Sequence, residues 1–123
     1  MRFLLIGRGR MGTLVEKTAL SGGDTVVAAL GHEDLGRLGE LGKCADVVVD
    51  FSSPAALDGL LEFGIVRGIP LVLATTGYSE EQLAAIDRAA AQIPIFRSAN
   101  MSLGVNVLLE LVRAAARALG DGY

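Results

Sequence analysis

The stretch that decides the fold is "RFLLIGRGRMGTLVEK", residues 2–17. Its apolar start predicts a buried strand over 2–6, and a helical pattern follows directly over 10–20. Between them, Gly7, Gly9 and Gly12 form the spacing G-x-G-x-x-G. After a strand and before a helix, this spacing is typical of dinucleotide binding: the first glycine permits a tight turn, the second lets a pyrophosphate approach, and the third lets helix and strand pack closely. The alternative is a purely structural turn, and the setting favours the nucleotide.

The helix that follows the glycines adds to this prediction. Its N-terminus offers free N–H groups to phosphates, and Arg8 and Arg10 add positive charge beside it. The helical spacing of its apolar residues predicts one packed face, which consists of Met11, Leu14, Val15 and Thr18.

Outward from this stretch, strand-like and helix-like segments alternate. Further strands are expected at 25–30, 46–51, 69–76 and 93–99, and further helices over 54–67, 79–92 and 105–119. The glycine-rich residues 31–45 predict a loop that has room for one helical turn. Apolar strands between amphipathic helices indicate an α/β fold, a Rossmann-like doubly wound parallel sheet of at least five strands with helices on both faces. Residues 1–123 are expected to form one dinucleotide-binding domain.

Several residues mark the expected ends of the helices. Ser53 is a candidate N-cap before Pro54, and Ser79 with Gln82 has the spacing of a capping box. Gly68 and Gly120 are expected to end helices. The last helix is expected to turn an apolar stripe inward, made of Val105, Leu108, Leu109, Val112 and Leu119.

Composition excludes several classes of function. Apolar residues make up 51% of the chain, the net charge is −3, and no basic run suggests nucleic acid. No apolar stretch reaches the roughly 20 residues of a membrane span, and no signal peptide is evident. The single cysteine, Cys44, is interpreted as a small apolar filler, which fits a reducing cytoplasm. No His, Cys or Asp cluster has the spacing of a metal site.

Polar residues follow three of the strands, at the sheet edge where such folds bind ligands. In "DFSSP", Asp50 is interpreted as a structural carboxylate in preference to a catalytic acid. The next two residues, 51–52, stand where they could cover a nicotinamide ring. "ATTGY" presents the hydroxyls of residues 75–76, and "SANMSLGVN" presents Asn100 and Ser102. Each hydroxyl has the alternative of capping the next helix, but the three ends together favour a site.

The end of the second strand is less clear. Many NAD-binding folds carry an acid there for the ribose hydroxyls, whereas this chain has Gly31. Glu33 is a candidate for the ribose, and His32 for a 2′-phosphate or the adenine, with a solvated loop as the alternative. The choice between NADH and NADPH therefore stays open.

Four motifs in order, "GRGRMG", "DVVVDFSSP", "ATTGYSEEQ" and "SANMSLGVNVLLELVRAAARALGDGY", resemble the N-terminal, nucleotide-binding half of the dihydrodipicolinate reductases. They cover nearly the whole chain. The resemblance implies an NADH- or NADPH-dependent oxidoreductase of the diaminopimelate route to lysine, which reduces a cyclic unsaturated dicarboxylate. It assigns Thr76 a possible substrate contact. The candidate cofactor-binding residues are Gly7, Arg8, Gly9, Arg10, Met11, His32, Glu33, Phe51, Ser52, Ala74, Thr75, Thr76, Ser98, Ala99, Asn100 and Met101.

The chain departs from the family pattern at three positions, where Ala74 replaces glycine, Met101 replaces phenylalanine and Gly31 replaces an acid. The family's histidine-rich segment, with its proton donor and substrate-binding lysine, is expected after "GDGY", and a substrate and tetramerisation domain after that. We therefore expect a cofactor-binding fragment with no catalytic residue and no turnover, its oligomeric state open and a homo-oligomer possible. The alternatives are a non-catalytic nucleotide-sensing module and an interaction domain.

Overall fold

The computed structural model describes residues 1–120, and its centre is a five-stranded sheet in the order β2-β1-β3-β4-β5. All neighbouring strands are parallel, so the α/β Rossmann-like prediction is confirmed. The strands are β1 (Arg2–Ile6), β2 (Thr25–Leu30), β3 (Val47–Asp50), β4 (Leu71–Leu73) and β5 (Ile95–Arg97). Residues 121–123 of the predicted domain, which include the "DGY" of the last motif, lie outside the described part.

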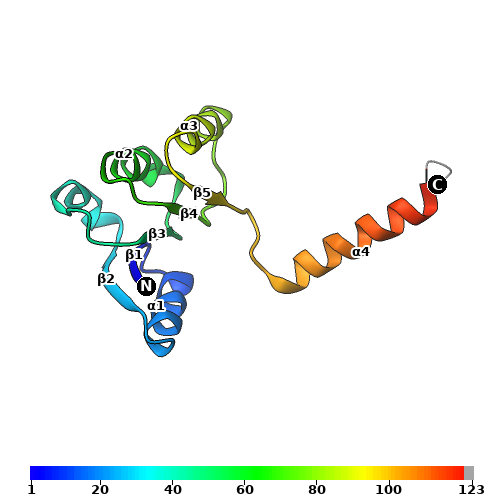
Figure 1. The fold of residues 1–123 in the computed structure, drawn as a ribbon, viewed down its shortest axis with the longest axis horizontal. Helices are drawn as coiled ribbons and strands as arrows, with labels where there is room; N and C mark the ends of the chain where they lie inside the picture. The colour runs from blue at the N-terminus through cyan, green and yellow to red at the C-terminus, as the bar shows by residue number, and fades with distance from the viewer. Residues whose placement is uncertain (121–123) are drawn as a thin grey trace.

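Helices lie on both faces of this sheet (Figure 1). One face carries α2 and α3, and the other carries α1. The helices are α1 (Arg10–Ser21), α2 (Leu57–Arg67), α3 (Glu80–Ala90) and α4 (Leu103–Leu119), with 3-10 helices η1 (His32–Glu40) and η2 (Pro54–Ala56).

The core lies between the sheet and the layer of η1, α2 and α3. Alternate strand residues such as Leu4, Val48 and Leu71 are buried there against Leu57 and Leu60 of the α2 helix. Because successive strand residues point to opposite faces, the neighbouring residues face the α1 side. On that side α1 covers β1 and β2, while Val72 of β4 is half-buried and Phe96 of β5 is 59% exposed. The sheet is therefore fully covered on one face and only partly on the other.

Residues 31–45 differ from the predicted loop. They contain η1, whose nine residues form about three turns at three residues per turn. The reason is packing: Leu38 of η1 is buried and Leu35 is partly buried against the core beside α2. The glycines at 36 and 39 have open space around them, so they permit the helix without requiring a loop.

The predicted packed face of α1 was wrong. Met11 is 48% exposed and Leu14 is 55% exposed, Thr18 is exposed and Val15 is only half-buried. The helix instead buries Gly12 and Ala19. The reason is that Gly12 packs directly against the backbone of Gly7, so the neighbouring flank of the helix, which includes Ala19, faces the sheet in place of the apolar stripe.

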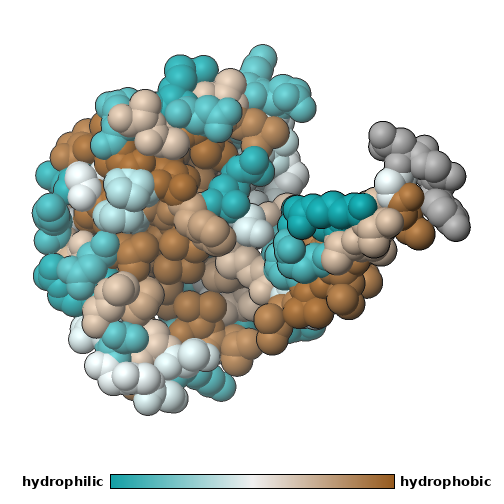
Figure 2. Space-filling view, turned by 45° about the vertical axis from the view of Figure 1, so that its right-hand side comes forward, coloured by the Kyte–Doolittle hydropathy of each residue, from teal (hydrophilic) through white to brown (hydrophobic). Residues whose placement is uncertain are grey.

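The prediction for the last helix was right about the helix and wrong about its packing. α4 forms over Leu103–Leu119, but none of its residues is buried. It stands away from the sheet (Figure 1), and its apolar surface is continuous along one side (Figure 2). The expected stripe is therefore exposed at Val105, Leu108, Leu109, Val112 and Leu119.

The predicted helix ends were mostly right. Gly68 ends α2 in the left-handed conformation and Gly120 ends α4 with φ +66°. Ser79 Oγ accepts a hydrogen bond from Gln82 N while Gln82 Oε1 accepts one from Ser79 N, as a capping box requires. Ser53 makes no side-chain cap, because the chain enters α2 through the 3-10 turn of η2.

Candidate functional site

The register of the sheet brings the predicted site residues to one edge. Ile6 pairs with both Leu30 and Asp50, Asp50 pairs with Leu73, and Leu73 pairs with Arg97. The residues that follow these partners therefore lie side by side at the carboxyl ends of the strands. They are Gly7, Gly31, Phe51, Ala74 and Ser98.

The glycine loop is held in this row by the strands on both sides. Gly7 has φ +98°, which favours glycine. Its N–H donates to Leu30 O at 2.9 Å, and a Cβ at Gly7 would lie 2.4 Å from Phe51 O. The turn is therefore tied to β2 and pressed against the chain that leaves β3.

Gly9 and Gly12 have different surroundings. A Cβ at Gly12 would lie 1.8 Å from Gly7 O, so this glycine is required by the approach of α1 to the loop. A Cβ at Gly9 would meet nothing within 4 Å, and the φ of Gly9 is an ordinary −76°. The protein itself therefore gives no steric reason for a glycine at position 9, and the space beside it is open to a ligand.

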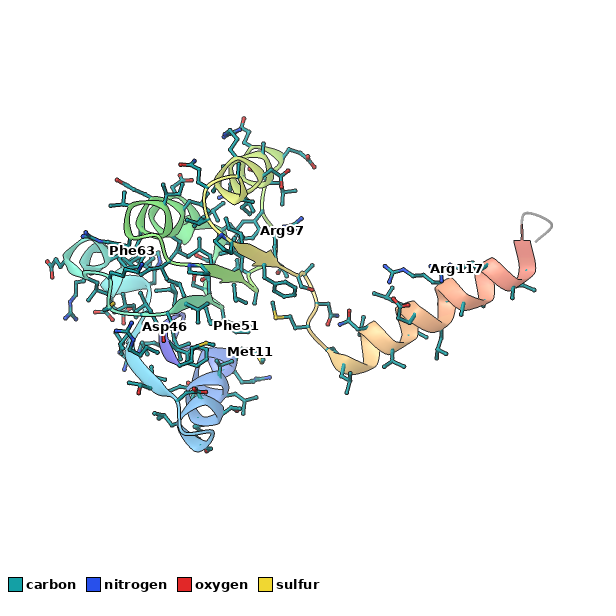
Figure 3. All side chains as sticks on the ribbon, viewed as in Figure 1. Met11, Asp46, Phe51, Phe63, Arg97 and Arg117 are labelled. Carbon is teal, nitrogen blue, oxygen red and sulfur yellow. The ribbon has the colours of Figure 1, made fainter. Side chains whose placement is uncertain are left out.

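Two adjoining hollows lie at this edge. One of about 300 Å³ is lined by Gly9, Arg10, Met11, Phe51, Ser52, Ala74, Thr75 and Thr76. The other, of about 450 Å³, is lined by Met11, Phe51, Ala74, Ser98, Ala99, Asn100, Met101 and Ser102. Figure 3 shows Met11 and Phe51 near each other, between α1 and the chain that leads to α4. The shared residues join the hollows into one elongated site.

The remaining predicted residues lie beside these hollows. Arg8 belongs to the glycine loop and is exposed. His32 and Glu33 begin η1 after β2, the outer strand, and both side chains are exposed. The predicted residues therefore extend along the edge of the sheet from the start of η1, after β2, to the turn after β5. Among residues 1–120, no group of three His, Cys, Asp or Glu residues is placed to hold a metal ion.

The two threonines after β4 differ in accessibility. Thr76 is exposed, whereas Thr75 is 7% exposed. Thr75 Oγ1 lies near the Tyr78 hydroxyl without a hydrogen bond of ordinary geometry. The hydroxyl of Thr76 is therefore the more available of the two at the sheet edge.

Asp50 organises the loops beneath the site. It is 1% exposed, and its Oδ1 accepts hydrogen bonds from Ser52 N, at 3.0 Å, and from Ser52 Oγ. Its Oδ2 accepts one from the Tyr78 hydroxyl at 3.3 Å. These contacts fit the structural role that the sequence favoured for Asp50. They also hold the turn after β3 against the loop after β4.

Tyr78 is a site-supporting residue that the sequence analysis missed. Burial and the negative charge of Asp50 raise the pKa of Tyr78 to about 12, so the hydroxyl stays protonated at neutral pH and donates a hydrogen bond to Asp50. The two residues are 28 positions apart. A polar residue directly after the "TTG" turn was the available signal.

Several polar groups of the "SANMS" segment form hydrogen bonds within the segment. Asn100 Oδ1 accepts from Ser102 N at 2.8 Å, and Ser98 Oγ donates to Asn100 O at 2.9 Å. Asn106 Nδ2 donates to Ser102 O at 2.8 Å. The helix-capping alternative thus holds for Ser102, which caps α4 by accepting from Val105 N, while Asn100 shapes the turn that lines the larger hollow.

Comparisons with known proteins identify relatives of this chain. Residues 1–101 match the family model described as "Dihydrodipicolinate reductase, N-terminus". A protein of Exiguobacterium sp. (strain ATCC BAA-1283 / AT1b) named 4-hydroxy-tetrahydrodipicolinate reductase is 45% identical over 115 residues, which cover 91% of this chain and 46% of that protein. One of the same name from Caldanaerobacter subterraneus subsp. tengcongensis is 43% identical and covers 100% of this chain and 52% of its own length. The chain thus spans about half the length of the curated relatives it matches.

Proposed function

The chain belongs to the dihydrodipicolinate reductase family through its N-terminal region, and we propose that it binds NADH or NADPH in the hollows at the carboxyl edge of its sheet. The bound group would supply a hydride. Residues 7–11 would hold the pyrophosphate at the start of α1, where free N–H groups and Arg10 offer positive charge. Phe51, Ala74 and residues 98–101 would orient the nicotinamide end.

The observation that carries this proposal is the contrast among the three glycines. Gly7 and Gly12 are required by contacts within the protein, whereas Gly9 is not. Gly9 lines a hollow together with Arg10 and Thr76. A dinucleotide that approaches the backbone closely explains the glycine at position 9, and the two adjoining hollows, which share three lining residues, support an elongated ligand.

The reaction of the whole protein is part of the same proposal. We infer a reductase of the diaminopimelate route to lysine, located in the cytoplasm, whose substrate is a cyclic unsaturated dicarboxylate touched by Thr76. Reduction also needs a proton donor within hydrogen-bond reach. The one histidine of the sequence, His32, follows the outer strand β2, away from the hollow formed by residues 98–102. We therefore expect these 123 residues to bind cofactor without turning over substrate.

The test is a titration of NADH and of NADPH, followed by the change in nicotinamide fluorescence. Wild type is expected to bind at least one of them saturably at sub-millimolar concentration. Gly9→Val is expected to abolish binding while the protein still folds, because the added side chain enters open space and the loss at this helix N-cap is about 1 kcal/mol. Gly59→Val is the matched control, since Gly59 is exposed in α2 and a Cβ there also meets nothing within 4 Å.

Two results would contradict the proposal. The first is wild-type protein that binds neither cofactor, which would favour an interaction domain or a sensor of another nucleotide. The second is a folded Gly9→Val variant that binds as tightly as wild type. Measurable reduction of substrate by the chain alone would contradict the expected lack of turnover, and would do so independently of the binding result.

A further inference from the structure

The outer end of the site, at the end of β2, lacks a side chain where dinucleotide-binding folds usually carry an acid. This position is Gly31, which follows directly after Leu30. Leu30 O accepts the Gly7 N–H at 2.9 Å, so the end of β2 is fastened to the glycine loop. A group presented at Gly31 is therefore next to the part of the site that would hold the pyrophosphate.

The carboxylate of Glu33 occupies the space that a side chain at Gly31 would fill. A Cβ built on Gly31 would lie 2.7 Å from Glu33 Oε1, 3.0 Å from Cδ and 3.1 Å from Oε2. In a glutamate, the carboxyl carbon lies roughly 2.5 Å from its own Cβ, because two carbon–carbon bonds of about 1.5 Å separate them. Glu33 thus delivers a carboxylate close to where an acid at position 31 would deliver its own.

A local turn explains how a residue two positions later reaches this place. Asp34 N donates to Gly31 O at 3.2 Å, and Gly31 N donates to Asp34 Oδ2 at 3.2 Å. These reciprocal hydrogen bonds close the first turn of η1. The turn brings the carboxylate of Glu33 beside Gly31. The absence of a side chain at Gly31 leaves the room that the Glu33 carboxylate takes.

The charges that the start of η1 brings to this position are negative, whereas Arg8 and Arg10 belong to the adjoining glycine loop. Glu33 and Asp34 are both acidic, and the sequence holds no lysine or arginine between residues 31 and 36. The next cation along the chain, Arg37, is paired with Asp34, because its guanidinium lies 3.7 Å from Asp34 Oδ1. A carboxylate suits two ribose hydroxyls, which donate hydrogen bonds to it, whereas a 2′-phosphate needs a cation such as arginine.

We propose that Glu33 is the residue that selects the cofactor, by accepting hydrogen bonds from the adenosine ribose hydroxyls and repelling a 2′-phosphate. The inference rests on the proposed function and deepens it: the cofactor of this chain is NADH in preference to NADPH. His32, the other candidate at this end, is then not a phosphate ligand.

The experiment compares the dissociation constants of NADH and NADPH for wild type and two variants. Wild type is expected to bind NADH at least about tenfold more tightly than NADPH. The reason is that the 2′-phosphate of NADPH would lie beside the negative charge of Glu33. Glu33→Gln keeps the size of the side chain but removes the charge, and is expected to bring the two constants to within roughly threefold, mainly by tighter NADPH binding. The wild-type preference is also expected to shrink as salt rises, because exposed charges are screened.

Gly31→Ala tests the position of the carboxylate rather than its charge. The backbone at Gly31 has φ −84°, which alanine adopts freely, and the added methyl group would displace only the flexible end of Glu33. NADH binding is expected to weaken and the preference to fall, although Glu33 is still present. Glu40→Gln is the matched control, since it removes one exposed negative charge from the far end of η1.

The outcomes separate this inference from the proposed function. If wild type binds neither cofactor, the proposed function fails and the inference with it. If both bind with equal affinity, or NADPH binds more tightly, the function stands and the inference is overturned. It is also overturned if Glu33→Gln leaves the ratio of the two constants at its wild-type value, or if Glu40→Gln changes the ratio by as much.

Discussion

Gly12 shows how a single hydrogen in place of a side chain positions the first helix. A Cβ at this residue would lie 1.8 Å from the backbone oxygen of Gly7, and backbone cannot yield as a side chain can. We predict that Gly12→Ala lowers the free energy of unfolding by about 3 kcal/mol, the upper part of the usual range for overpacking. Urea denaturation measures this loss. Gly36→Ala, in open space, is the control; an equal loss in both variants would contradict the steric cause.

Tyr78 gives a prediction about pH. Its pKa is raised to about 12 from 10, so the folded protein favours the neutral hydroxyl. The resulting stability is complete below pH 10 and is lost as the pH rises through about 12. Tyr78→Phe is expected to lower the free energy of unfolding at pH 7 by about 1.5 kcal/mol, the lower end of the range for a hydrogen bond to a charged group, and to flatten the alkaline decline.

The difference in tyrosinate absorbance between wild type and Tyr78→Phe isolates the titration of this residue from that of the other tyrosine, Tyr123. A midpoint near pH 10 in the difference curve would show that the surroundings of Tyr78 do not raise its pKa. An alkaline decline of equal steepness in the two proteins would also count against the link to Asp50.

At the scale of elements, the capping box of α3 is the best-defined local interaction. Ser79 and Gln82 exchange hydrogen bonds, and Gln82 Nε2 also donates to Pro54 O at 2.8 Å, which ties α3 to η2. We predict that Ser79→Ala lowers the free energy of unfolding by about 1 kcal/mol. Thermal or urea unfolding measures it against Ser53→Ala, a serine that also precedes a helix but makes no side-chain cap. Equal effects would mean that the box contributes nothing specific.

The elements and the row of strand ends could be predicted because they follow from local pattern. Parallel strands place their carboxyl ends at one edge, so the apolar runs before Gly7, Phe51 and Ser98 were enough to bring those residues together. The packing partner of an amphipathic face is not local. The stripe beginning at Val105 predicts a helix correctly but does not say what covers it. η1 was missed because its glycines resemble a loop, while burial of Leu38 beside α2 decides otherwise.

The finer features of the site depend on contacts between distant or reoriented residues. Asp50 and Tyr78 meet across 28 positions, and no period in the sequence links them. Glu33 reaches the space beside Gly31 only because the chain turns back there. The side chain of Asn100 shapes its own turn, which competes with a ligand for the same polar atoms. Such choices are decided by three-dimensional geometry and not by residue type.

At the scale of the whole molecule, two apolar surfaces lack a partner among residues 1–120. One is the α4 stripe defined above, with Leu108 59% exposed and Val112 57% exposed. The other is the α1 side of the sheet over β4 and β5, where Phe96 is 59% exposed. Hydrogen bonds through Asn100, Ser102 and Asn106 shape the turn from which α4 departs, and α4 points away from its own sheet (Figure 1). No helix in this part of the chain is long and apolar enough to cross a membrane.

We predict that the chain associates with a second copy of itself, each α4 covering the open sheet face of the other. Exposed apolar patches of this kind favour association, and exchange of an identical element is a low-cost route to a two-fold dimer. Light scattering across a dilution series is expected to show a monomer–dimer equilibrium that shifts to monomer when Leu108→Gln and Val112→Gln are combined. Arg117→Gln, at a polar position of the same helix, is expected to leave it unchanged. A monomer at every concentration would contradict the prediction and favour an α4 that folds back on its own sheet. A dimer that the Leu108→Gln and Val112→Gln substitutions leave unchanged would show that other surfaces associate.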